Sequence, residues 1–182
     1  MTHTIHRTEI DKMIVEVTHL SANLASKIIN EIHREQPALL DYLRYLANNS
    51  PVSNDSSLFS QTEYRYVYRM SIVLLKMLID SPYWLEEVSW DDLNNTITIS
   101  QPVADAVFSD PTNLANTVKR LAETHPEPEL LLFLSDACHK RLDNKPNEPP
   151  VRARYRTTTF LIFYTILTSV LNTRPVEKSY SN

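Results

Sequence analysis

The chain has 182 residues, with 42% hydrophobic and 22% charged side chains, a formal net charge of −4, one cysteine and no glycine. These fractions are those of a globular protein, and the absence of glycine excludes P-loops, G-x-G-x-x-G dinucleotide turns and G-x-S-x-G nucleophile elbows. A lone cysteine forms no internal disulfide, and the first residues lack the apolar stretch of a signal peptide, so we expect a cytoplasmic protein.

The first part of the chain has the pattern of two helices. Over about 8–34, apolar residues recur at steps of three and four, which predicts one long helix. Pro37 suits the first turn of a second helix, which ends near Asn48 or Asn49. Because the chain has no glycine, these asparagines are the expected left-handed C-caps.

The central part of the chain combines a helix with a predicted hairpin. Ser60 followed by Glu63 is a capping box, and it predicts a helix that ends near Ile79. Over 84–100, apolar and polar residues alternate in two short runs on either side of a polar turn at 91–94, which predicts a β-hairpin. A hairpin alone is marginally stable, so we expect it to pack on helices.

Three further helices are predicted over about 110–124, 127–142 and 152–171. The last is the most apolar, and its uncharged run barely reaches the length of a membrane span. Threonine and serine interrupt that run, so we predict a buried central helix that ends at an asparagine cap, Asn172. The expected centre of the core is Phe160, Phe163, Ile166, Leu167 and Val170.

Together these elements predict a mainly α fold. We expect about six helices in a single-domain bundle with one small β-hairpin near 84–100. The helical domain covers 1–176, and 177–182 form a disordered tail. The absence of glycine supports this fold class, because glycine destabilises a helix more than any residue except proline.

Charge is unevenly distributed along the chain. Residues 80–129 carry ten Asp and Glu against two bases, whereas residues 139–178 carry eight bases against three acids. Two interpretations follow. The two regions face each other within the fold, or one of them forms a polar surface that steers a partner or a second copy of the chain.

Motifs that carry chemistry are weak in this sequence. Glu16 and His19 form one E-x-x-H pair, but a di-iron bundle needs two, so we expect no metal and no cofactor. Arg120 and His125 have the R-x4-H spacing of some helical ribonucleases, in which arginine stabilises phosphate and histidine transfers protons. Cys138 falls on a leucine stripe, which predicts a core residue.

Tyrosine and arginine cluster in three places. Two are the predicted starts of the helix after Ser60 and of the helix over about 152–171, and the third is the helix that opens at Pro37. Both residue types are typical of the hot spots of protein interfaces. We therefore predict a non-enzymatic protein–protein interaction or assembly protein that self-associates, with no catalytic residue and no membrane partner. The predicted interaction residues are Tyr45, Tyr64, Arg65, Tyr68, Arg69, Arg152, Arg154 and Arg156.

Two alternatives remain open at this point. One is a small helical nuclease that uses Arg120 and His125. The other is an RNA- or DNA-binding module that uses the same tyrosines and arginines, since both stack on single-stranded bases. The acidic net charge argues against nucleic acid as the partner.

Overall fold

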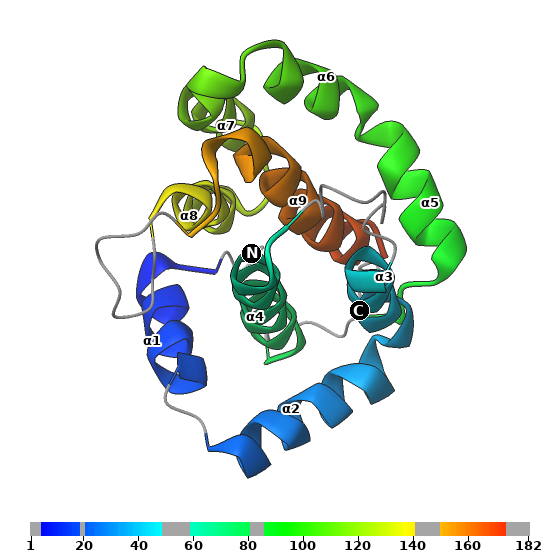
Figure 1. Ribbon diagram of the computed structural model, residues 1–182. Helices are drawn as coiled ribbons and strands as arrows, with labels where there is room; N and C mark the ends of the chain where they lie inside the picture. The colour runs from blue at the N-terminus through cyan, green and yellow to red at the C-terminus, as the bar shows by residue number, and fades with distance from the viewer. Residues whose placement is uncertain (1–4, 19–20, 49–58, 81–85, 141–149, 174–182) are drawn as a thin grey trace, which may run out of the picture.

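Figure 1 shows a computed structural model of the chain, which describes residues 5–18, 21–48, 59–80, 86–140 and 150–173. Within these ranges the regular structure is helical and contains no strand, which confirms the mainly α prediction. The described residues form more helices than the six expected. They are α1 (Arg7–Thr18), α2 (Ala22–Glu35), α3 (Pro37–Asn48), α4 (Gln61–Asp80), α5 (Trp90–Ile99), α6 (Gln101–Ser109), α7 (Leu114–Ala122), α8 (Pro128–His139) and α9 (Arg156–Thr173), with short 3-10 turns η1 (Pro111–Asn113) and η2 (Ala153–Tyr155).

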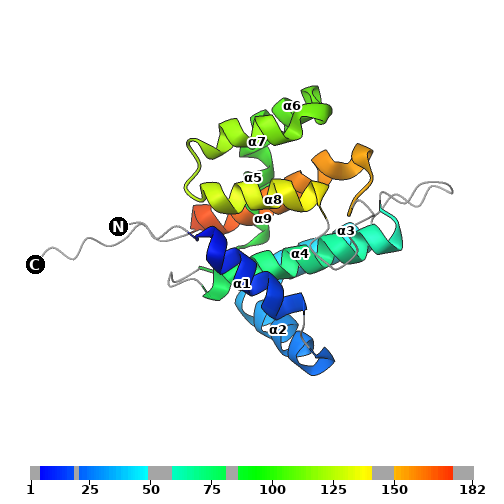
Figure 2. The same ribbon diagram turned by 90° about the vertical axis from the view of Figure 1, so that its left-hand side faces the viewer.

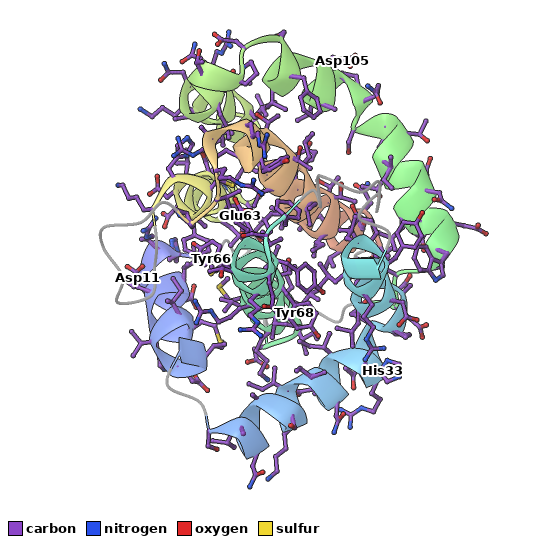
Figure 3. The ribbon with its side chains drawn as sticks, viewed as in Figure 1. Asp11, His33, Glu63, Tyr66, Tyr68 and Asp105 are labelled. Carbon is purple, nitrogen blue, oxygen red and sulfur yellow. The ribbon has the colours of Figure 1, made fainter. Side chains whose placement is uncertain are left out.

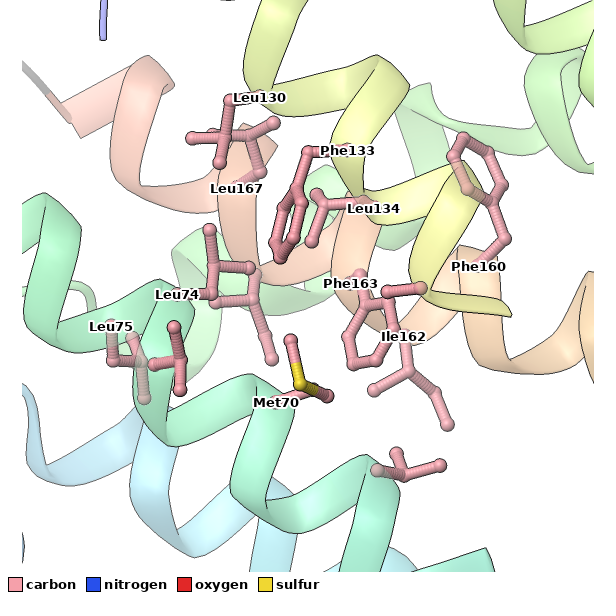
Figure 4. Packing of buried hydrophobic residues seen from close by; sticks show 14 of the residues in the cluster. Met70, Leu74, Leu75, Leu130, Phe133, Leu134, Phe160, Ile162, Phe163 and Leu167 are labelled. Carbon is pink, nitrogen blue, oxygen red and sulfur yellow. The ribbon is translucent and has the colours of Figure 1, made fainter. Parts of the chain in front are cut away.

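Helix α9 runs through the middle of the fold, with α4, α5 and α8 packed against it (Figure 1). Its predicted core residues are all fully buried, which confirms the central position expected from its apolar surface. Figure 4 shows how Met70 and Leu74 of α4, Phe133 of α8 and Phe163 of α9 meet in one cluster. No helix of the described residues is long and apolar enough to cross a membrane.

The N-terminal residues are attached to the start of α8 by backbone hydrogen bonds to carboxylates. The amide of Ile5 donates to Glu127 at 2.9 Å, and the amide of Arg7 donates to Glu129. The Arg7 guanidinium also lies 5.5 Å from the centre of the Phe133 ring. These contacts satisfy amides that the first turn of α1 leaves without helical partners. They place α1 beside α8, as both ribbon views show (Figure 2).

The single helix expected over 8–34 is wrong, because α1 ends at Thr18 and α2 begins at Ala22. Ser21 has an extended backbone (φ −66°, ψ 157°), and its hydroxyl accepts the Leu24 amide at 3.4 Å. This N-cap starts a new helix within an otherwise continuous apolar pattern. His19 lies outside the described residues, so its pairing with Glu16 is not described.

The hairpin expected at 84–100 is also wrong, because Trp90–Ile99 is helix α5. Ser89 and Asp92 form a complete capping box: the Asp92 amide donates to Ser89 Oγ at 3.1 Å, and the Ser89 amide donates to Asp92 Oδ2 at 2.9 Å. Leu93 and Thr96 are both buried three residues apart, which is helical spacing. The cap and this spacing outweigh the strand preference of the β-branched residues near the C-terminal end of α5.

A buried glutamine holds the segment that precedes α5. Gln36 is 1% exposed, and its side-chain amide donates to the Glu86 carbonyl at 3.0 Å and accepts the Val88 amide at 3.0 Å. Gln36 is also the C-cap of α2, directly before Pro37 opens α3 as predicted. One side chain therefore fixes the α2–α3 corner and the approach to α5 together.

No described residue has a positive φ, so the helix ends that lie within the described ranges carry no left-handed residue. Asn172 lies within α9, so the left-handed cap expected there is wrong. Helix α3 ends at Asn48, and the cap expected at Asn48 or Asn49 stays a prediction. Helix α2 ends instead at Gln36 (φ −144°) and α6 at Asp110 (φ −139°). Residues 49–58, Asn49 among them, and the expected tail 177–182 lie outside the described residues.

Two phenylalanines give a matched test of this core. Phe163 is fully buried on α9, whereas Phe108 on α6 is 54% exposed. Phe163→Ala should lower the free energy of unfolding by ~3–5 kcal/mol, through lost burial and the cavity left behind. Phe108→Ala should change it by less than about 1 kcal/mol. Urea denaturation followed by circular dichroism measures both, and equal midpoints for the two variants would contradict the position of α9.

Candidate interaction surface

Two tyrosines of α4 form the centre of the predicted interaction surface. Tyr64 and Tyr68 are four residues apart, and their ring centres lie 5.9 Å from each other. The Tyr64 hydroxyl donates to the Leu43 carbonyl of α3 at 3.5 Å. Figure 3 shows Tyr68 between α4 and α3. The structure therefore confirms that this local pair is formed and half-buried, with its rings held by a neighbouring helix.

The phenol groups of this pair have raised pKa values, chiefly because burial disfavours the phenolate. The positive charge of the Arg44 guanidinium on α3 partly opposes this shift, because it lowers the pKa of both phenols. Arg44 therefore lies within electrostatic reach of the pair. Arg44 also forms a 3.1 Å ion pair with Asp41. Tyr45, the next residue of α3, is 56% exposed.

The arginines of α4 lie beside the tyrosines on the side that faces solvent. Arg65 is exposed, and Arg69, one turn further along the helix, is half-buried. Their spacing places them on one stripe of α4, next to the stripe of the two tyrosines. The name Tyr/Arg face is used below for six residues. They are Arg44, Tyr45, Tyr64, Arg65, Tyr68 and Arg69.

Arg152 has a structural partner instead of a free guanidinium. Its side chain forms hydrogen bonds of 2.7–3.1 Å with both carboxylate oxygens of Glu63, and its amide donates to Glu63 Oε1 at 2.8 Å. The guanidinium groups of Arg152 and Arg154 each lie 4.7 Å from the centre of the Tyr155 ring. These two predicted residues therefore stabilise the approach to α9.

Glu63 combines this ion pair with the capping box that the sequence predicted. The Ser60 amide donates to Glu63 Oε2 at 2.7 Å, and the Glu63 amide donates to Ser60 Oγ at 3.2 Å (Figure 3). Burial alone would raise the pKa of Glu63, but the hydrogen bonds from Arg152 and Ser60 outweigh it and lower the pKa to about 2. The carboxylate therefore stays ionised throughout the physiological range.

Arg156 is half-buried near the start of α9, and Cys138 lies in the core. Arg156 is half-buried, and its Nε has no hydrogen-bond partner among the described residues. Its charge acts on Cys138, whose thiol is fully buried and donates to the Leu134 carbonyl at 3.2 Å. Burial raises the pKa of this thiol, so Cys138 is a core residue as predicted. The half-buried Arg156 stays a predicted interaction residue.

Arg120 and His125 differ in their surroundings. Arg120 is exposed on α7, whereas His125 is half-buried after that helix, with its ring centre 6.2 Å from that of Tyr164. His125 Nδ1 accepts the Glu127 amide at 3.1 Å. Burial lowers the pKa of His125, and Glu127 partly opposes this shift. One ring nitrogen is therefore already occupied by a backbone contact.

Acidic side chains in the described residues do not form a metal centre. No group of three or more His, Cys, Asp or Glu in these ranges is arranged to hold an ion. A groove of about 500 Å³ between α1, α2 and α4 has mixed charge, and its Lys76 is paired with Glu31 at 2.9 Å and with Asp80 at 2.6 Å. The basic group deepest in this groove is thus neutralised by its own neighbours.

Sequence reasoning missed a second surface, along α5 and α6. Because 84–100 was assigned to a hairpin, Trp90, Ile97 and Ile99 were expected to pack on helices, but they are 46%, 45% and 52% exposed. The Ser89-x-x-Asp92 capping box was the signal that could have identified α5. On α6, Phe108 is exposed as well.

No protein-family model matches the chain, and searches of curated proteins and of solved structures give no significant match.

The ion pair of Glu63 predicts a pH dependence of stability. The folded-state pKa of about 2 lies below the ordinary value of 4.5 that the unfolded chain is expected to have. The stability contributed by ionised Glu63 is therefore complete above about pH 5 and is lost as the pH falls through this window toward 2. Glu63→Gln should lower the free energy of unfolding by roughly 1–3 kcal/mol at pH 7.

Chemical denaturation of both proteins between pH 7 and pH 3 measures this effect. The difference in the free energy of unfolding between wild type and Glu63→Gln should shrink as the pH falls. The exposed control Glu87→Gln should keep a free energy of unfolding close to that of wild type throughout. A difference that is constant over the whole range would show that the carboxylate charge does not stabilise the fold.

Proposed function

We propose that this chain is a non-enzymatic protein–protein interaction or assembly protein, and that copies of it associate with each other through the Tyr/Arg face. On this view residues 1–176 act as one helical domain. The observation that carries the proposal is the Tyr64–Tyr68 pair, held 5.9 Å apart and flanked by exposed Tyr45 and Arg65.

Three physical properties support a role in binding. Tyrosine and arginine give large contact areas and directed hydrogen bonds, and they dominate the energetics of protein interfaces. The tyrosine rings pack against the core at their edges, so little side-chain entropy is lost on binding. The Ser60–Glu63 cap fixes the first turn of α4, from which Tyr64 and Arg65 directly follow.

Charge favours protein over nucleic acid as the partner. The chain has a net charge of −4, and a phosphate backbone is bound by clustered, uncompensated bases. In the Tyr/Arg face, Arg44 is compensated by Asp41. Single-stranded RNA is nevertheless the appropriate competitor in a test, since it also stacks on tyrosine.

The expected result is self-association at micromolar concentration that depends on the Tyr/Arg face. Arg65→Glu with Arg69→Glu should weaken it at least about tenfold, because charged hot-spot residues are lost. Lys12→Glu with Lys27→Glu is the matched control, since it changes the charge equally at exposed positions of α1 and α2. Multi-angle light scattering over a concentration series measures the association.

Circular dichroism must show that both double variants remain folded. The proposal fails if the wild type stays strictly monomeric and instead binds single-stranded RNA tightly, in a salt-sensitive manner that the Arg65/Arg69 variant abolishes. Loss of association in the Lys12/Lys27 control would place the interface on α1 and α2 instead.

A further inference from the structure

The outer side of α5 and α6 exposes an unusual share of apolar surface. Eight large hydrophobic side chains of the described residues are exposed, and four of them belong to this pair of short helices. Helix α5 buries Leu93 and Thr96 and packs on α9, which leaves Trp90 and Ile97 uncovered. These two are seven residues apart, which is two helical turns, so they lie on the same side of α5.

The same segment carries only negative charge. Residues 86–118 contain six Asp and Glu and no Lys, Arg or His. Asp91 and Asp105 are exposed, and none of the six carboxylates forms an ion pair within the described residues. The acidic α5–α6 face is the name used below for Trp90, Asp91, Ile97, Asp105 and Phe108.

The chemistry of this face determines what can cover it. A phosphate backbone or an anionic lipid surface is repelled by six uncompensated carboxylates. An apolar partner alone desolvates those carboxylates without supplying a counter-charge. A partner with arginines and aromatic rings satisfies both requirements, since guanidinium binds carboxylate and stacks on the indole of Trp90.

The Tyr/Arg face of this chain has that chemistry. It presents Arg65 and Tyr45 on α4 and α3, whereas the acidic α5–α6 face lies along the edge of the molecule formed by α5 and α6 (Figure 1). We infer that the acidic α5–α6 face of one copy docks the Tyr/Arg face of a second copy. This inference rests on the proposed self-association and names the surface that completes it.

Such a contact joins two different faces, so it is heterologous. After the first contact, one copy keeps an unused Tyr/Arg face and the other keeps an unused acidic α5–α6 face, so association continues until a ring closes or a filament grows. A contact of the Tyr/Arg face with itself would instead stop at the dimer and would bring like charges together. The two arrangements therefore differ in stoichiometry and in their response to mixing of variants.

Two variants that each block one face provide the test. Ile97→Lys with Asp105→Lys blocks the acidic face at exposed positions, and Arg65→Glu with Arg69→Glu blocks the Tyr/Arg face. Each variant alone should self-associate at least about tenfold more weakly than wild type. Mixed in equal amounts, they should form a 1:1 complex and nothing larger, since each supplies the intact face that the other lacks.

Light scattering and sedimentation velocity on the full chain give the stoichiometry, with Glu16→Lys and Leu24→Lys as a matched control on α1 and α2 that should assemble like wild type. Circular dichroism must again show that every variant remains folded.

If the Ile97/Asp105 variant assembles normally while the Arg65/Arg69 variant does not, the proposed function stands and this inference is overturned. If neither variant assembles and their mixture does not either, the contact is not between these two faces. A monomeric wild type overturns both proposals.

Discussion

The carboxylate of Glu63 connects the two helices on which the rest of the structure depends. It accepts hydrogen bonds from the amide that caps α4 and from both the amide and the guanidinium of Arg152, next to η2 and the start of α9. Its desolvation is compensated, because the pair has good geometry and Arg152 remains 45% exposed. The same bond therefore sets the relative position of α4 and α9, and it fixes the turn of α4 that presents the Tyr/Arg face.

The sequence patterns predicted what is local and what is strongly periodic. The burial of α9, the Pro37 start of α3 and the Ser60–Glu63 cap all follow from spacing within one element. The errors at 8–34 and 84–100 arose where a short capping signal competed with a longer pattern. At Ser21 an N-cap divides a continuous apolar stripe, and at Ser89 a capping box begins a helix from residues that alternate like a strand. In both cases the local hydrogen bonds decided the structure.

The candidate surface shows a different limit of sequence reasoning. Tyr64 and Tyr68 meet because they are four residues apart, and that contact was predictable. Arg152 was assigned to the same surface by residue type, but its partner Glu63 is 89 positions away in the sequence, so only the fold could reveal the pairing. Arg156 was assigned to the same surface by residue type as well, and it is half-buried, with its charge acting on Cys138. Residue type alone does not distinguish an arginine that binds a partner from one that stabilises its own chain.

The uneven charge of the sequence left two interpretations, and the described residues bear on the choice. No ion pair among them joins a carboxylate of 80–129 to a base of 139–178; Arg152 pairs with Glu63 instead. Within the described residues, the acidity of α5 and α6 is therefore not neutralised by the basic residues of 139–178. Salt screens exposed charges beyond about 8 Å at physiological ionic strength, so these carboxylates set the orientation and rate of an encounter more than its affinity. Affinity requires apolar contact as well, which on this face is provided by Trp90, Ile97 and Phe108.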